Sequence, residues 1–355
     1  MISYRAGIIG ATGLVGQRLI ERLSGHPWFG LAVVGASERS QGRSYRECVR
    51  WGLSEDPPED AASLTVQPCV PDAFEGCDFV LSGLAATAAR EIEPRFVAAG
   101  FPVISNASAF RMEPDVPLLV PEVNASHLSL LAAQRRRTGG GYWITNPNCS
   151  VTGLVMALAP LDRAFGVRRV VVATYQALSG AGLEGPRGLE IVDNVIPWIA
   201  GEEEKIEPET RKILGRAGED GLVESDARVS AHCHRVATLD GHLEAVSVEL
   251  EQSVSPEEAA RELGEFRGDV QGLGLPSAPP RPIVVRTEED RPQPRLDRGA
   301  GDGMSVVVGR VRRCSALTLR FEVLSHNAVR GAAGATLLNA ELLAGKGMLA
   351  AEVRR

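Results

Sequence analysis

The chain has 355 residues, of which 44% are hydrophobic and 23% are charged, and its formal net charge is -7. This length allows two domains of about 150 residues each, and the acidic balance argues against a general binder of nucleic acid or anionic membrane, because neither polyanion attracts an acidic surface. No apolar run approaches the roughly 20 residues that cross a bilayer, and the first ten residues do not resemble a signal peptide.

Strands alternate with helices over the first 110 residues. Short apolar strands are predicted at 6–9, 31–35, 79–82 and 103–105, and helices at 14–23 and 85–99. Such alternation is typical of a parallel sheet with right-handed crossovers. We therefore expect an α/β fold that opens with a Rossmann-like domain.

The pattern changes near residue 145. A helix is predicted to start at or beside Cys149, and the strands that follow are predicted at 169–176, 227–237, 242–250 and 304–311. Together they predict a larger, mixed sheet. The segment 271–302, rich in Pro, Gly and Arg, is interpreted as an extended arm, and the Ala-rich stretch from 328 as a helix that returns to the first domain. The expected division is 1–145 plus 328–355 for a nucleotide-binding domain, and 146–327 for a mixed α+β catalytic domain.

Six cysteines lie at positions 48, 69, 77, 149, 233 and 314, without paired spacing. This arrangement indicates neither a disulfide framework nor a zinc site. We therefore expect no metal, and a reducing, cytoplasmic location in which a thiol stays usable.

The first predicted strand is followed by a glycine motif, Gly10-Ala-Thr-Gly13-Leu-Val-Gly16, which opens a predicted helix. Glycines in such a turn let the backbone approach a pyrophosphate that rests on the positive end of the helix. The candidate dinucleotide-binding residues are Gly10, Thr12, Gly13, Leu14 and Val15. An ordinary turn between a strand and a helix is the alternative interpretation.

The end of the second strand bears on the choice of dinucleotide. An NAD enzyme usually places an Asp or Glu there to bind the ribose hydroxyls. This chain instead has Ser37, followed by Glu38, Arg39 and Ser40. The hydroxyls and Arg39 suit a 2′-phosphate, so NADP is favoured over NAD, although Glu38 could take the ribose role and the charges could belong to an ordinary polar loop.

Cys149 follows Asn146-Pro-Asn148 at a predicted helix start. Backbone N–H groups and the helix dipole at that position lower a thiol pKa and can bind an oxyanion. His242, at the start of a predicted strand, could exchange protons with the thiol near neutral pH. Sequence separation does not show that the two meet, and a small buried cysteine and a structural histidine remain the alternatives.

These and further stretches are similar to aspartate-semialdehyde dehydrogenases, in detail to the archaeal and fungal branch of that family. The similar stretches run in family order over nearly the whole chain: 10–16, 26–29, 34–40, 106–108, 111–112, 116–124, 145–152, 175–182, 201–209, 233–236, 240–242, 290–295 and 326–334. This coverage is far more specific than any single motif.

The resemblance implies a role for several residues. Cys149 would be the nucleophile, His242 the acid and base, and Gln176 the side chain that orients the reacting group. Arg235 would clamp the α-carboxylate of the substrate, a task that suits its planar fork. Glu202 would face the substrate amino group.

The remaining implied contacts divide between phosphate and nicotinamide. Lys205, Arg111 and Asn148 would bind phosphate, and Ser179, Gly180 and Asn327 would border the nicotinamide. From the residues alone, the acids near Glu202 could be a solvated face, Arg111 a surface ion-pair partner, and Gln176 a core amide.

The reaction implied is the reversible, NADPH-dependent reductive dephosphorylation of L-aspartyl 4-phosphate to L-aspartate 4-semialdehyde through a thioester on Cys149. This step belongs to lysine, threonine and methionine biosynthesis. The implied partners are the small-molecule substrate and phosphate, with 146–327 also serving to form a homodimer or homotetramer. The alternatives are a related acyl-thioester reductase such as a malonyl-CoA reductase, an N-acetylglutamyl-phosphate reductase, and a non-catalytic NADP-binding homologue. Glu202 argues against the malonyl substrate, which has no ammonium group.

Two residues depart from the family pattern. Phe110 stands where the family usually has His before the Arg-Met pair, and Ala237 stands where it usually has Pro. Neither change removes a reacting group, but both leave room for a shifted substrate preference.

Overall fold

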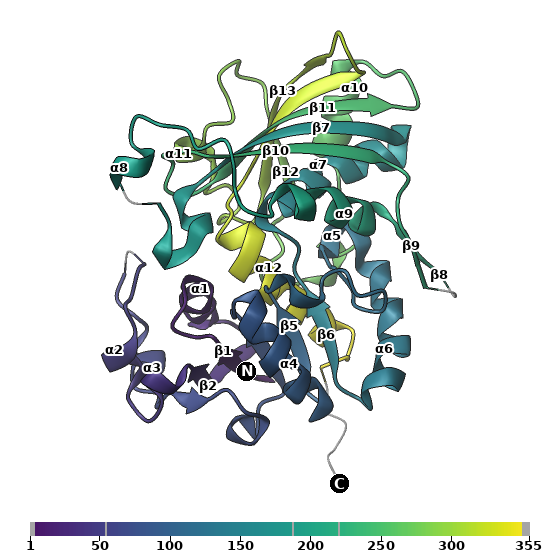
Figure 1. Ribbon diagram of the computed structural model, residues 1–355. Helices are drawn as coiled ribbons and strands as arrows, with labels where there is room; N and C mark the ends of the chain where they lie inside the picture. Colours follow the sequence, from purple (N-terminus) through teal and green to yellow (C-terminus); the bar gives the residue numbers. More distant parts are fainter. Residues whose placement is uncertain (1–3, 54, 187, 219–220, 350–355) are drawn as a thin grey trace.

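The computed structural model describes residues 4–53, 55–186, 188–218 and 221–349 (Figure 1). Two six-stranded sheets form its framework, one in the lower and one in the upper half of Figure 1. The α/β fold class predicted from the sequence is confirmed, with a parallel nucleotide-binding sheet and a second, mixed sheet.

The first sheet is parallel throughout, in the order β3-β2-β1-β4-β5-β6. Its strands are β1 (Tyr4–Ile9), β2 (Phe29–Ala36), β3 (Gln67–Pro68), β4 (Phe79–Ser82), β5 (Pro102–Ser105) and β6 (Tyr142–Thr145). The helices around it are α1 (Leu14–Leu23), α2 (Tyr45–Cys48), α3 (Glu59–Ala62), α4 (Ala86–Ala98) and α6 (Leu131–Thr138). The short helix α5 (Pro121–Asn124) contacts α7, α9 and α12. Chain order reverses between β1 and β4, and ligands of open parallel sheets bind at the carboxyl ends of strands beside such a reversal.

The second sheet is mixed, in the order β10-β7-β11-β14-β13-β12. Its strands are β7 (Val167–Gln176), β10 (Arg228–Arg235), β11 (His242–Leu250), β12 (Ile283–Arg286), β13 (Val306–Arg313) and β14 (Leu319–Ser325). The pairs β10/β7 and β12/β13 are parallel, and the other pairs are antiparallel. Helix α7 (Cys149–Phe165) packs against β7, β11, β13 and β14, with α9 (Glu203–Leu214) and α10 (Pro256–Glu265) beside it. The smaller elements are α8 (Gly188–Ile191), α11 (Pro294–Asp297) and the β8/β9 hairpin (Arg216–Gly218, Gly221–Val223).

The segment expected to be an extended arm, 271–302, is partly regular. It contains β12, which forms an edge of the second sheet by pairing with β13, and the short helix α11. Prolines at positions 279, 280 and 282 precede β12, and proline is typical of edges and loops rather than of strand interiors. The prolines that precede β12 explain why the sequence did not predict this edge strand.

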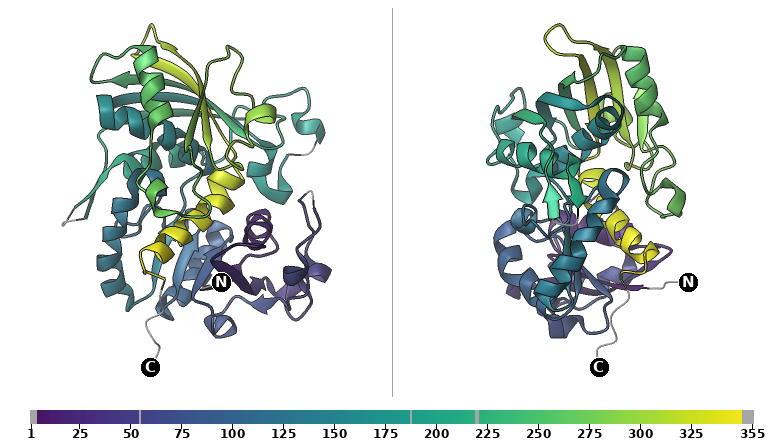
Figure 2. Two further views of the ribbon diagram at one scale, coloured as in Figure 1. Left: turned by 180° about the vertical axis from the view of Figure 1, so that it is seen from behind. Right: turned by 90° about the vertical axis from the view of Figure 1, so that its right-hand side faces the viewer.

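The end of the chain returns to the first sheet. β14 leads through a single π-helical segment, η7 (Val329–Ala333), into α12 (Gly334–Gly345), seen in yellow between the two halves in Figures 1 and 2. Leu337, Leu338 and Leu342 of α12 belong to the same buried apolar cluster as Ala6 and Ile8 of β1. None of the helices within the described residues is long and apolar enough to cross a membrane.

A fully buried ion pair joins three segments beneath the second sheet. Arg330 of η7 donates from both terminal nitrogens to Glu122 of α5, at 2.7 Å each, and Nη2 also lies 3.2 Å from Met156 Sδ of α7. Both charged side chains are 0% exposed. The parallel double hydrogen bond offsets part of the cost of removing the two charges from water, although the buried Arg330 Nε has no hydrogen-bond partner.

Removing one member of this pair leaves the other buried without compensation. We expect Arg330→Met to lower the free energy of unfolding by about 3–5 kcal/mol. Arg46, which is 57% exposed and pairs with Glu59, offers the matched control, and Arg46→Met is expected to change stability by less than about 0.5 kcal/mol. Denaturant unfolding of both variants checks this. Equal losses in the two variants would contradict the role given to the buried pair.

Candidate active site

A cleft of about 1050 Å³ lies between the two sheets, and Cys149 is on its wall. The predicted site residues that line it are Arg111, Asn148, Cys149, Glu202 and Lys205 from the substrate set, and Leu14, Val15, Ser179, Gly180 and Asn327 from the cofactor set. Chain topology brings these segments together, because α7 begins, β7 ends and β11 begins at the same edge of the second sheet.

Cys149 is the first residue of α7, a helix of 17 residues. Asn148 caps this helix, since its Oδ1 accepts a hydrogen bond of 2.8 Å from the Ser150 backbone N–H. Such a cap leaves the thiol at the positive end of the helix dipole, where an anion is stabilised.

The Cys149 thiol touches His242, the first residue of β11, with Sγ and Nε2 3.1 Å apart. The sequence left this contact open, because 93 positions separate the two residues. The other ring nitrogen, Nδ1, accepts a hydrogen bond of 3.0 Å from the Ala177 backbone N–H. A backbone N–H only donates, so the neutral imidazole carries its proton on Nε2 and points that proton at the sulfur.

The surroundings favour uncharged forms of both groups. Desolvation lowers the pKa of His242 to about 3, and the nearby Arg235 and His326 contribute to the same direction. Desolvation also raises the pKa of Cys149 to about 12, with a further rise from Glu202, while Arg111, Arg235 and the Ser150 N–H oppose it. Near neutral pH the ligand-free site therefore holds a thiol beside a neutral imidazole.

Gln176 and Arg235 end the adjacent parallel strands β7 and β10, where they are in register. Gln176 Nε2 lies 3.4 Å from Glu202 Oε2, and Arg235 Nη1 donates to the Ala177 carbonyl at 2.8 Å. Gly180 packs against both Arg235 and His242, since a Cβ atom at Gly180 would lie 3.1 Å from Arg235 Nη1 and 3.2 Å from His242 Nε2. A glycine thus lets the loop after β7 cover the imidazole and the guanidinium closely.

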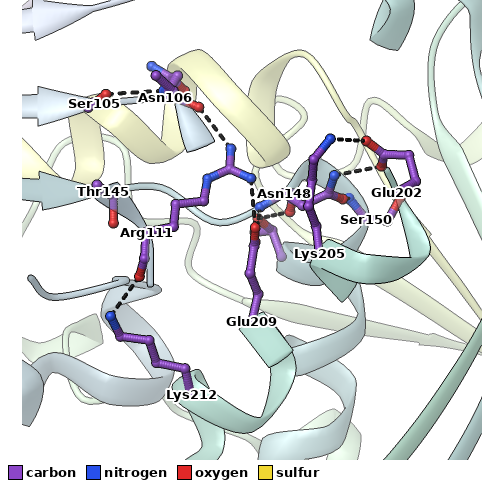
Figure 3. A network of polar contacts seen from close by, with 12 residues as sticks. Ser105, Asn106, Arg111, Thr145, Asn148, Ser150, Glu202, Lys205, Glu209 and Lys212 are labelled. Carbon is purple, nitrogen blue, oxygen red and sulfur yellow. Dashed lines mark hydrogen bonds and ion pairs between the residues drawn. The ribbon is translucent and has the colours of Figure 1, made fainter. Parts of the chain in front are cut away.

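Charged groups of opposite sign surround the helix start (Figure 3). The Glu202 carboxylate accepts from Asn148 Nδ2 at 2.6 Å and from Lys205 Nζ at 3.2 Å. Arg111 is buried, and its Nη1 donates to Glu209 Oε1 at 2.9 Å. Each candidate cation for phosphate therefore has a carboxylate partner, and the interpretation of Glu202 as part of a solvated acidic face is wrong for this residue.

Several residues at the site were not identified from the sequence. Glu209 and Lys212 of α9 contact Arg111, although 98 and 101 positions separate each from it. Gly331 of η7 packs against the nucleophile candidate so closely that a Cβ atom there would lie 2.6 Å from Cys149 Cβ. A glycine in an Ala-rich helix is a weak signal, and nothing local distinguishes Glu209 from the other acids of α9.

The nicotinamide set is joined by hydrogen bonds. Asn327 Nδ2 donates to Ser179 Oγ at 2.8 Å, and its Oδ1 accepts from the Gly241 N–H at 2.8 Å. Asn327 thereby connects the loop after β7 with the residue that precedes His242.

The turn before α1 fits a bound dinucleotide. Gly10 has a positive φ of 78°, and a Cβ atom at Gly16 would lie 2.4 Å from the Gly10 carbonyl oxygen. Gly13 caps α1 without a side chain, so the first N–H groups of the helix remain open to a pyrophosphate. Thr12 lies in this turn, between Gly10 and the cap.

The residues predicted to bind the 2′-phosphate lie just after β2, away from Cys149. Ser37 precedes the short helix η1 (Glu38–Ser40) at the end of β2. Ser37 and Arg39 are exposed and Ser40 is buried. None of the three lines the cleft around Cys149.

The departure at Phe110 is absorbed by packing. Its ring stacks on Trp143 of β6 with centroids 4.7 Å apart. Phe110 therefore adds apolar contact beside Arg111, which still turns toward Asn106 and Glu209.

Within the described ranges, no group of His, Cys, Asp and Glu side chains is arranged to hold a metal ion. A glycine-lined turn on a parallel sheet, facing a thiol and an imidazole on a second sheet, defines a two-domain, dinucleotide-dependent dehydrogenase. Comparison with known families agrees with this class. Residues 5–131 match the semialdehyde dehydrogenase NAD binding domain, and residues 158–330 match the semialdehyde dehydrogenase dimerisation domain.

Named relatives are similar over nearly their whole length. The chain is 50% identical to the aspartate-semialdehyde dehydrogenase of Archaeoglobus fulgidus, covering 96% of this chain and 98% of the relative. It is 45% identical to that of Aspergillus fumigatus, covering 98% and 100%. The crystal structure of the Candida albicans enzyme with NADP superimposes with a TM-score of 0.91 at 42% identity, covering 97% of this chain and 99% of that one. The chain belongs to the aspartate-semialdehyde dehydrogenase family, as its sequence resemblance indicated.

The protonation state of Cys149 predicts how the thiol reacts in the ligand-free protein. Because desolvation raises its pKa to about 12, the thiolate fraction grows roughly tenfold per pH unit below that value. We expect the rate of Cys149 alkylation by iodoacetamide to rise steadily from pH 7 to pH 10, as measured by peptide mass spectrometry.

Cys314 of the same chain is the internal control. Desolvation raises its pKa, but hydrogen bonds from the Leu317 and Ala316 backbones, the Ser247 hydroxyl and the charge of Arg320 together outweigh that effect and lower its pKa. Its alkylation rate should therefore level off at a lower pH than that of Cys149. A plateau for Cys149 below pH 8 would show that the free protein already holds a thiolate.

Proposed function

We propose that this protein is an NADP-dependent aspartate-semialdehyde dehydrogenase of lysine, threonine and methionine biosynthesis. It interconverts L-aspartyl 4-phosphate and L-aspartate 4-semialdehyde through a thioester on Cys149. The observation that carries the proposal is the 3.1 Å contact between Cys149 Sγ and His242 Nε2 at the capped start of α7. Full-length similarity to aspartate-semialdehyde dehydrogenases of archaea and fungi supports it.

The cofactor site is proposed on the turn before α1 and on η1. Gly10, Thr12, Gly13, Leu14 and Val15 would hold the pyrophosphate. Ser37, Arg39 and Ser40 would hold the 2′-phosphate, and Ser179, Gly180 and Asn327 would border the nicotinamide. NADP supplies the hydride chemistry when it is bound, and the Candida albicans relative was solved with NADP.

Each charged group of aspartyl phosphate has a candidate partner near Cys149. Arg235 would bind the α-carboxylate, and Glu202 would bind the ammonium group. Lys205, Arg111 and Asn148 would bind the phosphate. Since Glu202 is the second cause of the raised Cys149 pKa, an ammonium group beside Glu202 would weaken that effect and favour ionisation of the sulfur.

In the biosynthetic direction Cys149 Sγ bonds to the β-carbonyl carbon and the bond from that carbon to the phosphate oxygen breaks. The thiol proton leaves with the phosphate, so the charges balance. The N–H groups at the start of α7 that the Asn148 cap does not use, and the Nε2–H of His242, would donate to the oxygen of the tetrahedral intermediates. Gln176 would orient that oxygen. After reduction the C–S bond breaks, which releases the aldehyde and returns the sulfur as a thiolate.

The role of His242 in this scheme is chiefly that of a donor. The resemblance implies a general acid and base, but its Nδ1 accepts from the Ala177 N–H, so the ring presents a proton rather than a lone pair to the sulfur. A neutral imidazole that donates a hydrogen bond is sufficient for the proton balance given above.

The alternatives are less well matched. A malonyl-CoA reductase would leave Glu202 without a cation to bind, and a non-catalytic homologue would not need to retain the thiol, the imidazole and Arg235 together. The site retains all three, with Arg235 and His242 both packed against Gly180.

We also propose a division into 1–145 plus 328–355 and 146–327, and assembly into a homodimer or homotetramer through the second sheet. The packing of α12 with β1 supports the division. On β7, Val171 and Tyr175 face away from α7 and are 45% and 39% exposed, which gives this sheet an apolar surface for a second copy. The need for a free Cys149 supports a reducing, cytoplasmic location.

The decisive assay runs in the reverse direction, following NADPH formation from aspartate semialdehyde, NADP and phosphate. We expect saturable dependence on phosphate and a lower KM for NADP than for NAD. Cys149→Ala is expected to reduce turnover by at least about 10³-fold, while NADP binding, measured by calorimetry, stays within twofold. Retained turnover in that variant would exclude the thioester route, and turnover with CoA but not with phosphate would favour the acyl-CoA alternative.

A further inference from the structure

Helix α9 presents four charged side chains to the site from one face. Glu202 caps the helix, and Lys205, Glu209 and Lys212 follow at spacings of three and four residues, which align on one side of a helix. Figure 3 shows this face against the start of α7 and against Arg111. Glu202 and Lys205 already have proposed substrate roles, whereas Glu209 and Lys212 do not.

Glu209 connects two groups that the reaction needs close together. Its Oε1 accepts from Arg111 Nη1 at 2.9 Å, and its Oε2 accepts from the Asn148 backbone N–H at 2.6 Å. The side chain is only 2% exposed, so these hydrogen bonds are shielded from water. One carboxylate therefore sets the separation between Arg111 and the residue that precedes Cys149.

The guanidinium of Arg111 is also held from a second side. Its Nη2 donates to the Asn106 carbonyl at 2.8 Å. An arginine fixed at both terminal nitrogens has already lost its rotamer freedom, so it does not lose that freedom again when it binds a ligand. Each terminal nitrogen still has a second N–H, and Arg111 lines the cleft.

Lys212 holds the backbone that carries Arg111. Its ammonium group is buried and donates to the carbonyls of Arg111, Glu113 and Val116 at 2.6, 2.7 and 3.0 Å. Three carbonyls gathered around one ammonium fix the course of 111–116. Glu209 and Lys212 thus act on the side chain and the backbone of the same arginine.

We propose that Glu209, supported by Lys212, is a positioning residue that holds Arg111 at a set distance from Cys149 for binding of the phosphate group. The inference rests on the proposed function, in which Arg111 binds phosphate. Glu209 touches neither the substrate nor the sulfur. It acts through Arg111, while the hydrogen bond from the Asn148 N–H anchors the carboxylate itself.

Glu209→Gln tests this in the full-length protein with inorganic phosphate in the reverse assay. The amide has nearly the same volume, but its NH₂ group replaces one of the two oxygens that now accept from Arg111 and Asn148. In this geometry one of the two donors would face another donor. We expect the KM for phosphate to rise about tenfold or more, with the KM values for aspartate semialdehyde and NADP within twofold. Glu204→Gln, an exposed acid on the same helix, is the matched control and should leave all three KM values unchanged.

Coupling to Arg111 separates positioning from a general structural effect. In an Arg111→Gln background, Glu209→Gln should change the KM for phosphate by less than twofold, because there is no guanidinium left to hold. Effects that multiply independently in the double variant would overturn the proposal. So would a uniform fall in kcat with the phosphate KM unchanged, or a lower phosphate KM, which would show that Glu209 competes with phosphate.

A second variant covers the case in which Glu209→Gln does not fold, as judged by its thermal midpoint. Glu209→Asp keeps the charge but is one methylene shorter, and it should raise the phosphate KM severalfold; an unchanged KM would overturn the proposal. If the wild-type protein itself shows no phosphate dependence, the proposed function fails. If the wild type depends on phosphate and the Glu209 variants match it, the positioning role alone fails.

Discussion

The start of helix α7 is the constraint on which the rest of the site depends. Asn148 caps the helix with its Oδ1, and it donates from its Nδ2 to Glu202 and from its backbone N–H to Glu209. These three hydrogen bonds fix the position of Asn148 and therefore of the adjacent Cys149. Both sheets converge on this point. β11 supplies the imidazole from one side, and η7, on the way back to the first sheet, supplies the close contact of Gly331 from the other.

Charge balance follows from the same arrangement. A pocket for a carboxylate and a phosphate needs cations, but unpaired cations beside the half-buried Cys149 thiol would be costly to desolvate. Two acids on one face of α9 reduce this cost, because Glu202 pairs with Lys205 and Glu209 pairs with Arg111. The site therefore keeps an uncharged thiol and imidazole among paired ions, and in the proposed function the charged groups of the substrate would replace some of these pairs.

Local patterns in the sequence predicted what is local in the structure. The glycine turn, α1 and the helix at Cys149 follow from neighbouring residues, and the strands β4 and β11 have the predicted bounds. The contacts of Glu209 and Lys212 with Arg111 depend on side chains about one hundred positions away, and no spacing rule reaches that far. The sequence did not predict β12, because prolines precede it. The tautomer of His242 depends on the backbone N–H of Ala177, just after the end of β7. Similarity to a known family supplied the pairing of Cys149 with His242 that the residues alone left open.

In the proposed mechanism the acyl group passes through the sulfur of Cys149. Mixing the protein with aspartate semialdehyde and NADP in the absence of phosphate tests it most directly, by absorbance for NADPH and by intact and peptide mass spectrometry for the adduct. We expect a burst of at most one NADPH per chain and an aspartyl group on Cys149, which phosphate then removes. NADPH formation without an adduct on Cys149, or an adduct on another residue that phosphate discharges, would contradict it.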